Sequence, residues 1–118
     1  MRRRPAQPDT FLPLRSVSYL ALLVLAEGEV HAYALIKEIA RKSDGLVRPG
    51  PASIHRTLRQ LGEAGLIEES DERPVPALDD ARRRYFRLTP LGREVVKAET
   101  DRLQTIVSRA ARSLRDVS

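Results

Sequence analysis

The sequence predicts a mainly α chain of the α+β class, with three helices, a β-hairpin and a long C-terminal helix in that order. Apolar residues recur at helical spacing in three successive segments, and two short segments of strand character then flank a polar stretch. From Thr89 to about Arg115 nothing interrupts a helix except a weak Gly92. At 118 residues, the chain is long enough for one domain with a single small core.

The first two predicted helices span about 14–26 and 31–43. The apolar residues of the first are too dense for a surface helix, so we expect it to be buried on most sides and to end at Glu27-Gly28. The second helix ends at Asp44-Gly45 and has a single apolar stripe. This stripe consists of Leu35, Ile36, Ile39 and Ala40.

The third predicted helix opens at Gly50-Pro51, with proline in the favoured first turn. Charged residues make up 31% of the chain, yet the stretch from Leu46 to Gly62 has three arginines, one histidine and no carboxylate. Its apolar stripe, Ile54, Leu58 and Leu61, would hold the helix to a core while the polar face points outward. Such a helix suits a DNA groove, and the alternative is an ordinary solvated amphipathic helix.

Two strands are predicted next, at 66–69 and 84–88. The stretch 70–83 between them has two prolines, seven charges and no apolar periodicity, which indicates a hairpin with an exposed tip. Thr89-Pro90 is then a strong helix start, because an N-cap candidate precedes proline. Three helices followed by a hairpin make the winged helix-turn-helix arrangement, in which the hairpin is the wing. The alternative is a small α+β domain without a nucleic-acid role.

These elements divide the chain into three parts. Residues 1–13, with Arg2, Arg3 and Arg4 near their start and three prolines, are expected to form a disordered basic arm. Residues 14–88 are the winged helix-turn-helix domain, and residues 89–118 are a C-terminal dimerisation helix. The arginines could also mimic a secretory signal, but the prolines that follow them, and Glu27 where a cleavage site should be, argue against export.

The composition restricts partners and chemistry. A net charge of +5 favours an acidic partner, and the absence of cysteine excludes disulfides and fits a reducing cytoplasm. His31 and His55 have no further ligand at metal-binding spacing, so we expect no metal site. We also expect that the chain binds no cofactor and is not an enzyme. No Cys–His or Ser–His pairing occurs in a context typical of an enzyme family, and no glycine-rich phosphate loop appears. The longest uncharged apolar stretch is too short to span a membrane.

Four motifs follow one another between about Leu20 and Arg115. They are His31-Ala-Tyr-Ala-Leu, Ala52-Ser-Ile-His-Arg-Thr-Leu, Leu61-Gly-Glu-Ala-Gly-Leu-Ile and Arg83-Arg-Tyr-Phe-Arg-Leu-Thr-Pro-Leu-Gly. In this order they resemble the PadR family of bacterial transcriptional regulators. Two residues depart from the family pattern: Ala32 stands where Gly is usual, and His55 where Tyr is usual. Histidine can still donate to phosphate, but its reach is shorter and its charge depends on pH.

The third helix holds the main expected DNA contacts. Arg56 and Arg59 are the first candidates, because the guanidinium fork matches O6 and N7 of guanine together. The alternative is that one of them pairs with Glu63 or another nearby acid. Further candidates for base or phosphate contacts are Ser53, His55 and Gln60.

The base of the wing holds a second group of expected contacts. Arg82, Arg83 and Arg84 are placed to meet the flanking DNA backbone or the minor groove. The alternative is a solvated charge cluster, since Asp79 and Asp80 lie just before them. The tyrosines at positions 33 and 85 are expected to be packing residues with their hydroxyls at the surface.

The last helix has a second expected function. A helix of about 26 residues is roughly 39 Å long, more than a small winged domain covers, so a second copy would cover its apolar stripe symmetrically. The residues expected in this homodimer contact are Val96, Leu103, Ile106, Val107, Ala110 and Leu114. The alternative is that the helix folds back on its own core. The resemblance implies dimers built through this helix and the first one.

The sequence therefore predicts a DNA-binding transcriptional regulator that acts as a homodimer on double-stranded DNA with an inverted-repeat operator. We expect a repressor, and the resemblance implies release from DNA by a small-molecule effector, although 4% aromatics and no tryptophan leave no visible stacking slot. The alternative is a winged module that binds another protein rather than a specific DNA sequence. The acidic cluster at 68–72 would suit that alternative, but the acid-free helix would not.

Overall fold

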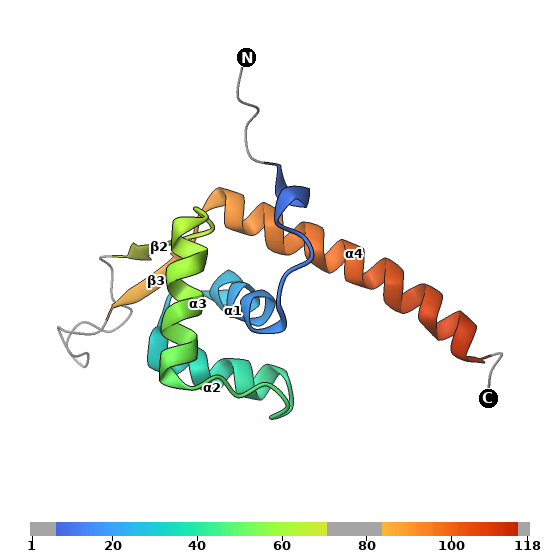
Figure 1. Cartoon of the computed structure of the whole chain (residues 1–118), viewed down its shortest axis with the longest axis horizontal. Coiled ribbons are helices and arrows are strands. Elements are labelled where there is room, and N and C mark those ends of the chain that lie inside the picture. The colour runs from blue at the N-terminus through green and yellow to red at the C-terminus, as the bar shows by residue number, and fades with distance from the viewer. Residues whose placement is uncertain (1–6, 71–83, 116–118) are drawn as a thin grey trace, which may run out of the picture.

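The computed structural model describes residues 7–70 and 84–115, and over these it has the predicted order of elements (Figure 1). Three helices come first, two paired strands follow, and a long helix ends the described chain. They are α1 (Ser16–Glu27), α2 (Ala32–Lys42), α3 (Pro51–Glu63), β2 (Ile67–Ser70), β3 (Tyr85–Leu88) and α4 (Pro90–Arg115). The predicted mainly α, α+β winged helix-turn-helix fold with a long C-terminal helix is confirmed.

Helix α1 is the centre of the core. Ala21, Leu22, Val24 and Leu25 are buried, and the helix contacts α2, α3, α4 and β3. Because neighbours cover it on several sides, it is apolar around most of its circumference, as predicted. Among the described residues, no helix combines the length and the hydrophobicity needed to cross a membrane.

Helices α2 and α3 pack on α1 through their predicted stripes. The chain leaves α2 through Asp44 and Gly45, which both have positive φ, so the predicted stop is confirmed. It leaves α3 through Gly65, whose φ is +79°, while the N–H of Leu66 donates to the carbonyl of Leu61 at 2.9 Å. This hydrogen bond is typical of a helix C-terminus at which one residue adopts the left-handed conformation. Glycine adopts that conformation without a steric penalty.

The sheet has three antiparallel strands in the order β1-β3-β2. Strands β2 and β3 pair from Ile67↔Leu88 to Ser70↔Tyr85, which confirms the two predicted hairpin strands; the predicted tip at 71–83 lies outside the described residues. Strand β1 (Val30–His31) was not predicted, because two residues are too few to show alternation.

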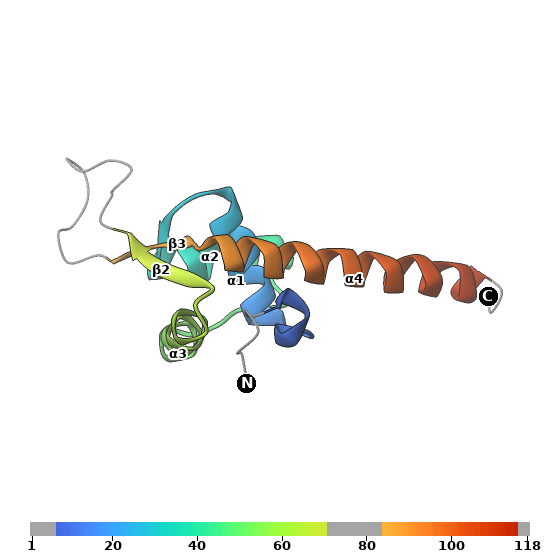
Figure 2. The same ribbon diagram turned by 90° about the horizontal axis from the view of Figure 1, so that it is seen from above.

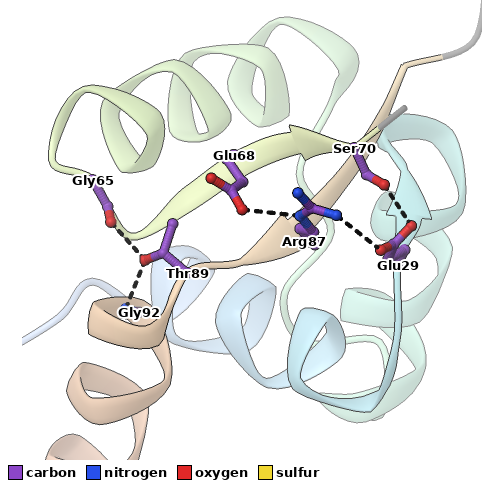
Figure 3. A network of polar contacts seen from close by, with 7 residues as sticks. All are labelled: Glu29, Gly65, Glu68, Ser70, Arg87, Thr89 and Gly92. Carbon is purple, nitrogen blue, oxygen red and sulfur yellow. Dashed lines mark hydrogen bonds and ion pairs between the residues drawn. The ribbon is translucent and has the colours of Figure 1, made fainter. Parts of the chain in front are cut away.

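Polar contacts fasten the hairpin to the turn before β1 (Figure 3). The Arg87 guanidinium donates to Glu68 at 2.9 Å and lies 3.9 Å from Glu29. The Ser70 hydroxyl donates to the same Glu29 carboxylate at 2.7 Å. Residues from three separate segments thus fix the position of the wing relative to the helices.

A second set of contacts joins the start of α4 to the exit of α3 (Figure 3). The Thr89 hydroxyl donates to the carbonyl of Gly65 at 2.6 Å and accepts the N–H of Gly92 at 3.0 Å, so the predicted helix cap is confirmed. A Cβ at position 92 would lie 1.9 Å from the carbonyl oxygen of Leu66. Gly92 therefore does not weaken the last helix as its type suggested. It is required because the backbone of Leu66 lies too close for any side chain at this position.

Helix α4 leaves the core partway along its length and extends well beyond it (Figure 2). Val95, Val96 and Glu99 are buried against the domain, whereas every residue from 104 to 115 is exposed. Val96 is only 5% exposed within the protomer, so the prediction that it is a dimerisation residue is wrong. The apolar residues at positions 96, 103 and 110 repeat every seven residues, and this repeat runs from the part of the helix that its own core covers into the part that the core leaves open.

The N-terminal segment also differs from the prediction of a disordered arm over residues 1–13. Pro8–Phe11 form a 3-10 helix, η1, that contacts α4, and Phe11 and Leu12 pack against the core. The prediction is therefore wrong for residues 8–13, because their apolar side chains cover a surface beside α4. Residues 1–6, with the three arginines, lie outside the described residues.

A buried carboxylate helps to hold this segment. Glu99 is 1% exposed, and it accepts the backbone N–H of Leu14 at 2.7 Å and the Nε–H of Arg102. The hydrogen bond from Arg102 is the main reason why the pKa of Glu99 lies below its ordinary value, and the bond from Leu14 adds to it against the opposing effect of burial. Nothing in the sequence pattern indicated this contact.

Candidate nucleic-acid interface

Helix α3 turns a polar face to the outside. The five residues predicted on it are all exposed, namely Ser53, His55, Arg56, Arg59 and Gln60. Within the described parts of the chain, neither Arg56 nor Arg59 forms an ion pair with a carboxylate, including Glu63 at the end of the helix. Both guanidinium groups therefore keep their five donors available for an anion.

A hollow of about 980 Å³ lies between the start of α2, α3 and the hairpin. Its floor is apolar, with Ile54, Leu58, Ile67 and Phe86 among the residues that line it. His55 and Arg59 line it from α3, whereas Arg56 is not among the lining residues. The polar face of α3 is thus divided: one edge faces the hollow and the hairpin, and the rest faces outward.

The two carboxylates of the hairpin that the structure describes, Glu68 and Glu69, are paired with nearby arginines. Glu69 forms an ion pair with Arg84 at 3.3 Å, and Glu68 accepts the hydrogen bond from Arg87. Such exposed pairs contribute little to stability, but each places a cation beside an acid that would otherwise repel a polyanion. Of the predicted wing arginines, Arg84 is the described one and is exposed, and Arg82 and Arg83 lie outside the described residues.

Two residues of α2 beside this hollow were missed as candidates. Tyr33 was predicted to be a packing residue, but it is 65% exposed and lines the hollow, so that prediction is wrong. The ammonium of Lys37 lies 5.5 Å from the centre of its ring. The signal was present in the sequence, because positions 33 and 37 fall off the apolar stripe of α2. Tyr85, by contrast, is buried as predicted and packs edge-on against His31.

The distal half of α4 presents an apolar stripe outside the core. Leu103 is half-buried, and the other predicted residues of this stripe are exposed, with Val107 at 64% and Leu114 at 65%. The exposed members are Ile106, Val107, Ala110 and Leu114. The alternative that the helix folds back on its own core is contradicted for this half.

Residues 21–98 match the transcriptional regulator PadR-like family, a stretch that runs from α1 through the hairpin into α4. The chain belongs to this family. The family is one of transcriptional regulators, which agrees with the resemblance that the sequence motifs indicated.

A curated relative of this PadR-like chain comes from Streptomyces fradiae, where it is an uncharacterized 37.1 kDa protein in transposon TN4556. The two are 32% identical over 94 residues, which are 80% of this chain and 25% of the relative. The PadR-like chain thus spans about a quarter of the length of that protein.

Three solved structures illustrate how widely the PadR-like fold is shared. A transcriptional regulator from Clostridium thermocellum is 21% identical, with a TM-score of 0.68 over 92% of this chain and 97% of that one. A PadR-like regulator from Bacillus cereus is 18% identical, with a TM-score of 0.70 over 83% and 90%. Bacillus subtilis PadR in complex with operator DNA is 19% identical, with a TM-score of 0.58 over 77% and 48%. At these identities the similarity shows the fold.

Proposed function

We propose that this PadR-like chain is a homodimeric repressor that binds an inverted-repeat operator, with α3 of each protomer in a major groove. The observation that carries the proposal is the outward face of α3, where two exposed arginines have no carboxylate partner among the described residues. A helix with such a face fits the major groove of double-stranded DNA, which is about 12 Å wide. Bacillus subtilis PadR, which has a similar fold, is known in complex with operator DNA, and this supports DNA binding by the present chain.

The side chains of α3 have different proposed roles. Arg56 is exposed and does not line the hollow, so we assign it to a base edge, where its fork would fit guanine. Arg59 and His55 face the hollow and the wing, so they would contact a base or a phosphate at one edge of the groove. Ser53 and Gln60 lie on the other flank of the helix and would make the remaining base or phosphate contacts.

The wing is assigned to the DNA that flanks each half-site. Arg84 is exposed at the start of β3, and Arg82 and Arg83 precede it in the sequence. Contacts from these arginines to the backbone or the minor groove would add affinity but little sequence information.

The dimer is assigned to α4, with α1 beside it as the family resemblance implies. Leu103, Ile106, Val107, Ala110 and Leu114 form a stripe that a second copy of the helix would cover. We place the repressor in the cytoplasm, where bacterial DNA lies, and propose that an unidentified small-molecule effector releases it.

The competing proposal is a winged module that binds another protein. Its main support was the acidic cluster at 68–72, but Glu68 and Glu69 are paired with arginines of β3 and of the residue before it. Salt separates the two functions, because phosphate contacts give a steep fall of the binding constant as salt rises.

The test uses an operator selected by the intact protein from a random duplex library. Arg56→Ala and Arg59→Ala are each expected to weaken operator binding by about 1–3 kcal/mol, with a smaller loss on nonspecific duplex. Arg93→Ala, which removes an exposed arginine from α4, is the matched control and should change neither. Equal losses on both duplexes would show that the two arginines only position the protein, and no loss would contradict α3 as the recognition helix.

A further inference from the structure

Tyr33 is an exposed aromatic residue in the first turn of α2. Its side chain does not serve the core, since 65% of the residue is open to solvent while Leu35 and Ile39 of the same helix are fully buried. The phenol has its ordinary donor and acceptor hydroxyl, and no hydrogen bond to it is seen among the described residues. An exposed aromatic beside a basic surface is more typical of a binding surface than of a packing residue.

Lys37, one helical turn later, is a cation without an acidic partner in the described chain. The next cations of α2 are paired: Arg41 with Glu38, and Lys42 with Glu27. Lys37 instead holds its ammonium over the Tyr33 ring, 5.5 Å from the ring centre. This i,i+4 contact keeps the charge close to the hollow without neutralising it.

The position of this pair relates it to the recognition helix. Tyr33 lines the same hollow as His55 and Arg59, so the start of α2 and one edge of α3 form two walls of a single surface, with the hairpin beyond. A helix in the major groove has a sugar-phosphate strand running along its side, and duplex DNA carries about one negative charge per 1.7 Å of its axis. A backbone strand beside this edge of α3 would pass over the hollow and meet the pair.

We propose that Tyr33 and Lys37 anchor one strand of the DNA backbone where it passes this hollow, with the tyrosine hydroxyl donating to a phosphate oxygen and the lysine ammonium neutralising a phosphate. The inference rests on the proposed binding of α3 to a major groove. The pair positions the recognition helix and does not read bases, because phosphate oxygens carry no sequence information.

The test compares two conservative variants with matched controls in the full-length protein. Lys37→Gln removes one charge, and Lys97→Gln removes an exposed lysine from α4, outside the hollow. Tyr33→Phe removes one hydroxyl, and Tyr19→Phe removes a hydroxyl that contacts Thr100 of α4. Binding to the operator and to nonspecific duplex is measured as a function of salt.

We expect Lys37→Gln to reduce the slope of log K against log salt by about one on both duplexes, and Lys97→Gln to leave it unchanged. Tyr33→Phe should weaken binding to both duplexes by about tenfold, the loss typical of a hydrogen bond to a charged group, while Tyr19→Phe does not. A slope for Lys37→Gln equal to that of the wild type would overturn the proposal, and so would a loss for Tyr33→Phe on the operator alone. If the wild-type protein itself shows no salt-dependent binding, the proposed function fails, and this inference fails with it.

Discussion

At the scale of single residues, Glu99 shows how a buried charge can be tolerated. Its carboxylate is 1% exposed but accepts two hydrogen bonds, one from Arg102 and one from the backbone of Leu14. The second bond joins residues that are 85 positions apart, so this single side chain fastens the N-terminal segment to α4.

Glu99→Gln is expected to destabilise the fold by about 1–3 kcal/mol at pH 7, because the two bonds are accepted by different carboxylate oxygens and the amide keeps only one acceptor, so one bond is lost and the other loses its anionic acceptor. The pKa of Glu99 is lowered in the folded state, so its contribution is fully present above the unfolded value of about 4.3 and is lost as pH falls through the folded value. Denaturant unfolding at a series of pH values should therefore show the wild type and the variant converging at low pH. Glu94→Gln, on an exposed part of α4, is the control and should change stability by less than about 0.5 kcal/mol. A difference between wild type and Glu99→Gln that stays constant down to pH 3 would contradict this role.

Gly92→Ala is expected to destabilise the protein by about 1–3 kcal/mol, the usual cost of overpacking, or more. The new methyl group would meet the carbonyl of Leu66, a backbone atom that cannot move without shifting the start of β2. Gly62→Ala is the matched control, because a Cβ at position 62 would meet no atom within 4 Å beyond its chain neighbours and the nearby backbone of α3. There, alanine should stabilise the helix by about 0.5–1 kcal/mol. Thermal unfolding of the two variants gives the comparison, and equal effects would contradict the close approach at Gly92.

At the scale of elements, the sequence was informative wherever structure is local. The helices from α1 to α4 were predictable because their apolar residues recur at helical spacing and because Pro51, Gly65 and Thr89 mark their ends. Strand β1 and the ordered structure of residues 8–13 were not predictable, since both depend on contacts with segments distant in the sequence. Val96 was assigned to the dimer contact, although it packs against its own core, for a related reason. The seven-residue repeat shows that one stripe of α4 is apolar, but it does not show which surface covers that stripe.

The candidate site, like the fold, was predictable only where it depends on the pattern within a single element. The exposed face of α3 followed from its helical pattern, so its five residues were correctly placed on one polar surface. The hollow, and with it the neighbourhood of Tyr33 and Arg59, requires α2, α3 and the hairpin to be brought together in space. No pattern within one of these segments contains that information.

The distal half of α4 gives the element-scale prediction. Ile106→Asp should yield a monomer at micromolar concentration, because it places a charge in the apolar stripe that the second copy covers. Thr105→Asp adds the same charge on the opposite side of the same turn and should remain a dimer. Light scattering distinguishes the two states. A monomeric wild type, or an unchanged dimer for Ile106→Asp, would contradict the assignment of this stripe.

At the scale of the whole molecule, the proposed dimer and the proposed DNA binding depend on one another. A two-fold axis that pairs two copies of α4 also relates two copies of α3, and each copy should enter a major groove on the same side of the duplex. The two half-sites must then be inverted repeats, with centres about one helical turn, or 10–10.5 base pairs, apart, or a multiple of that spacing.

The most direct measurement is footprinting on an operator with five base pairs inserted at its centre. The insertion turns the second half-site to the opposite side of the DNA, so specific affinity should fall close to the nonspecific level while salt-dependent binding to any duplex persists. An operator whose five central base pairs are replaced without a change in length is the control and should keep both halves protected. Protection of both halves at unchanged affinity on the lengthened operator would contradict the account, because either the dimer or the placement of α3 would then be wrong.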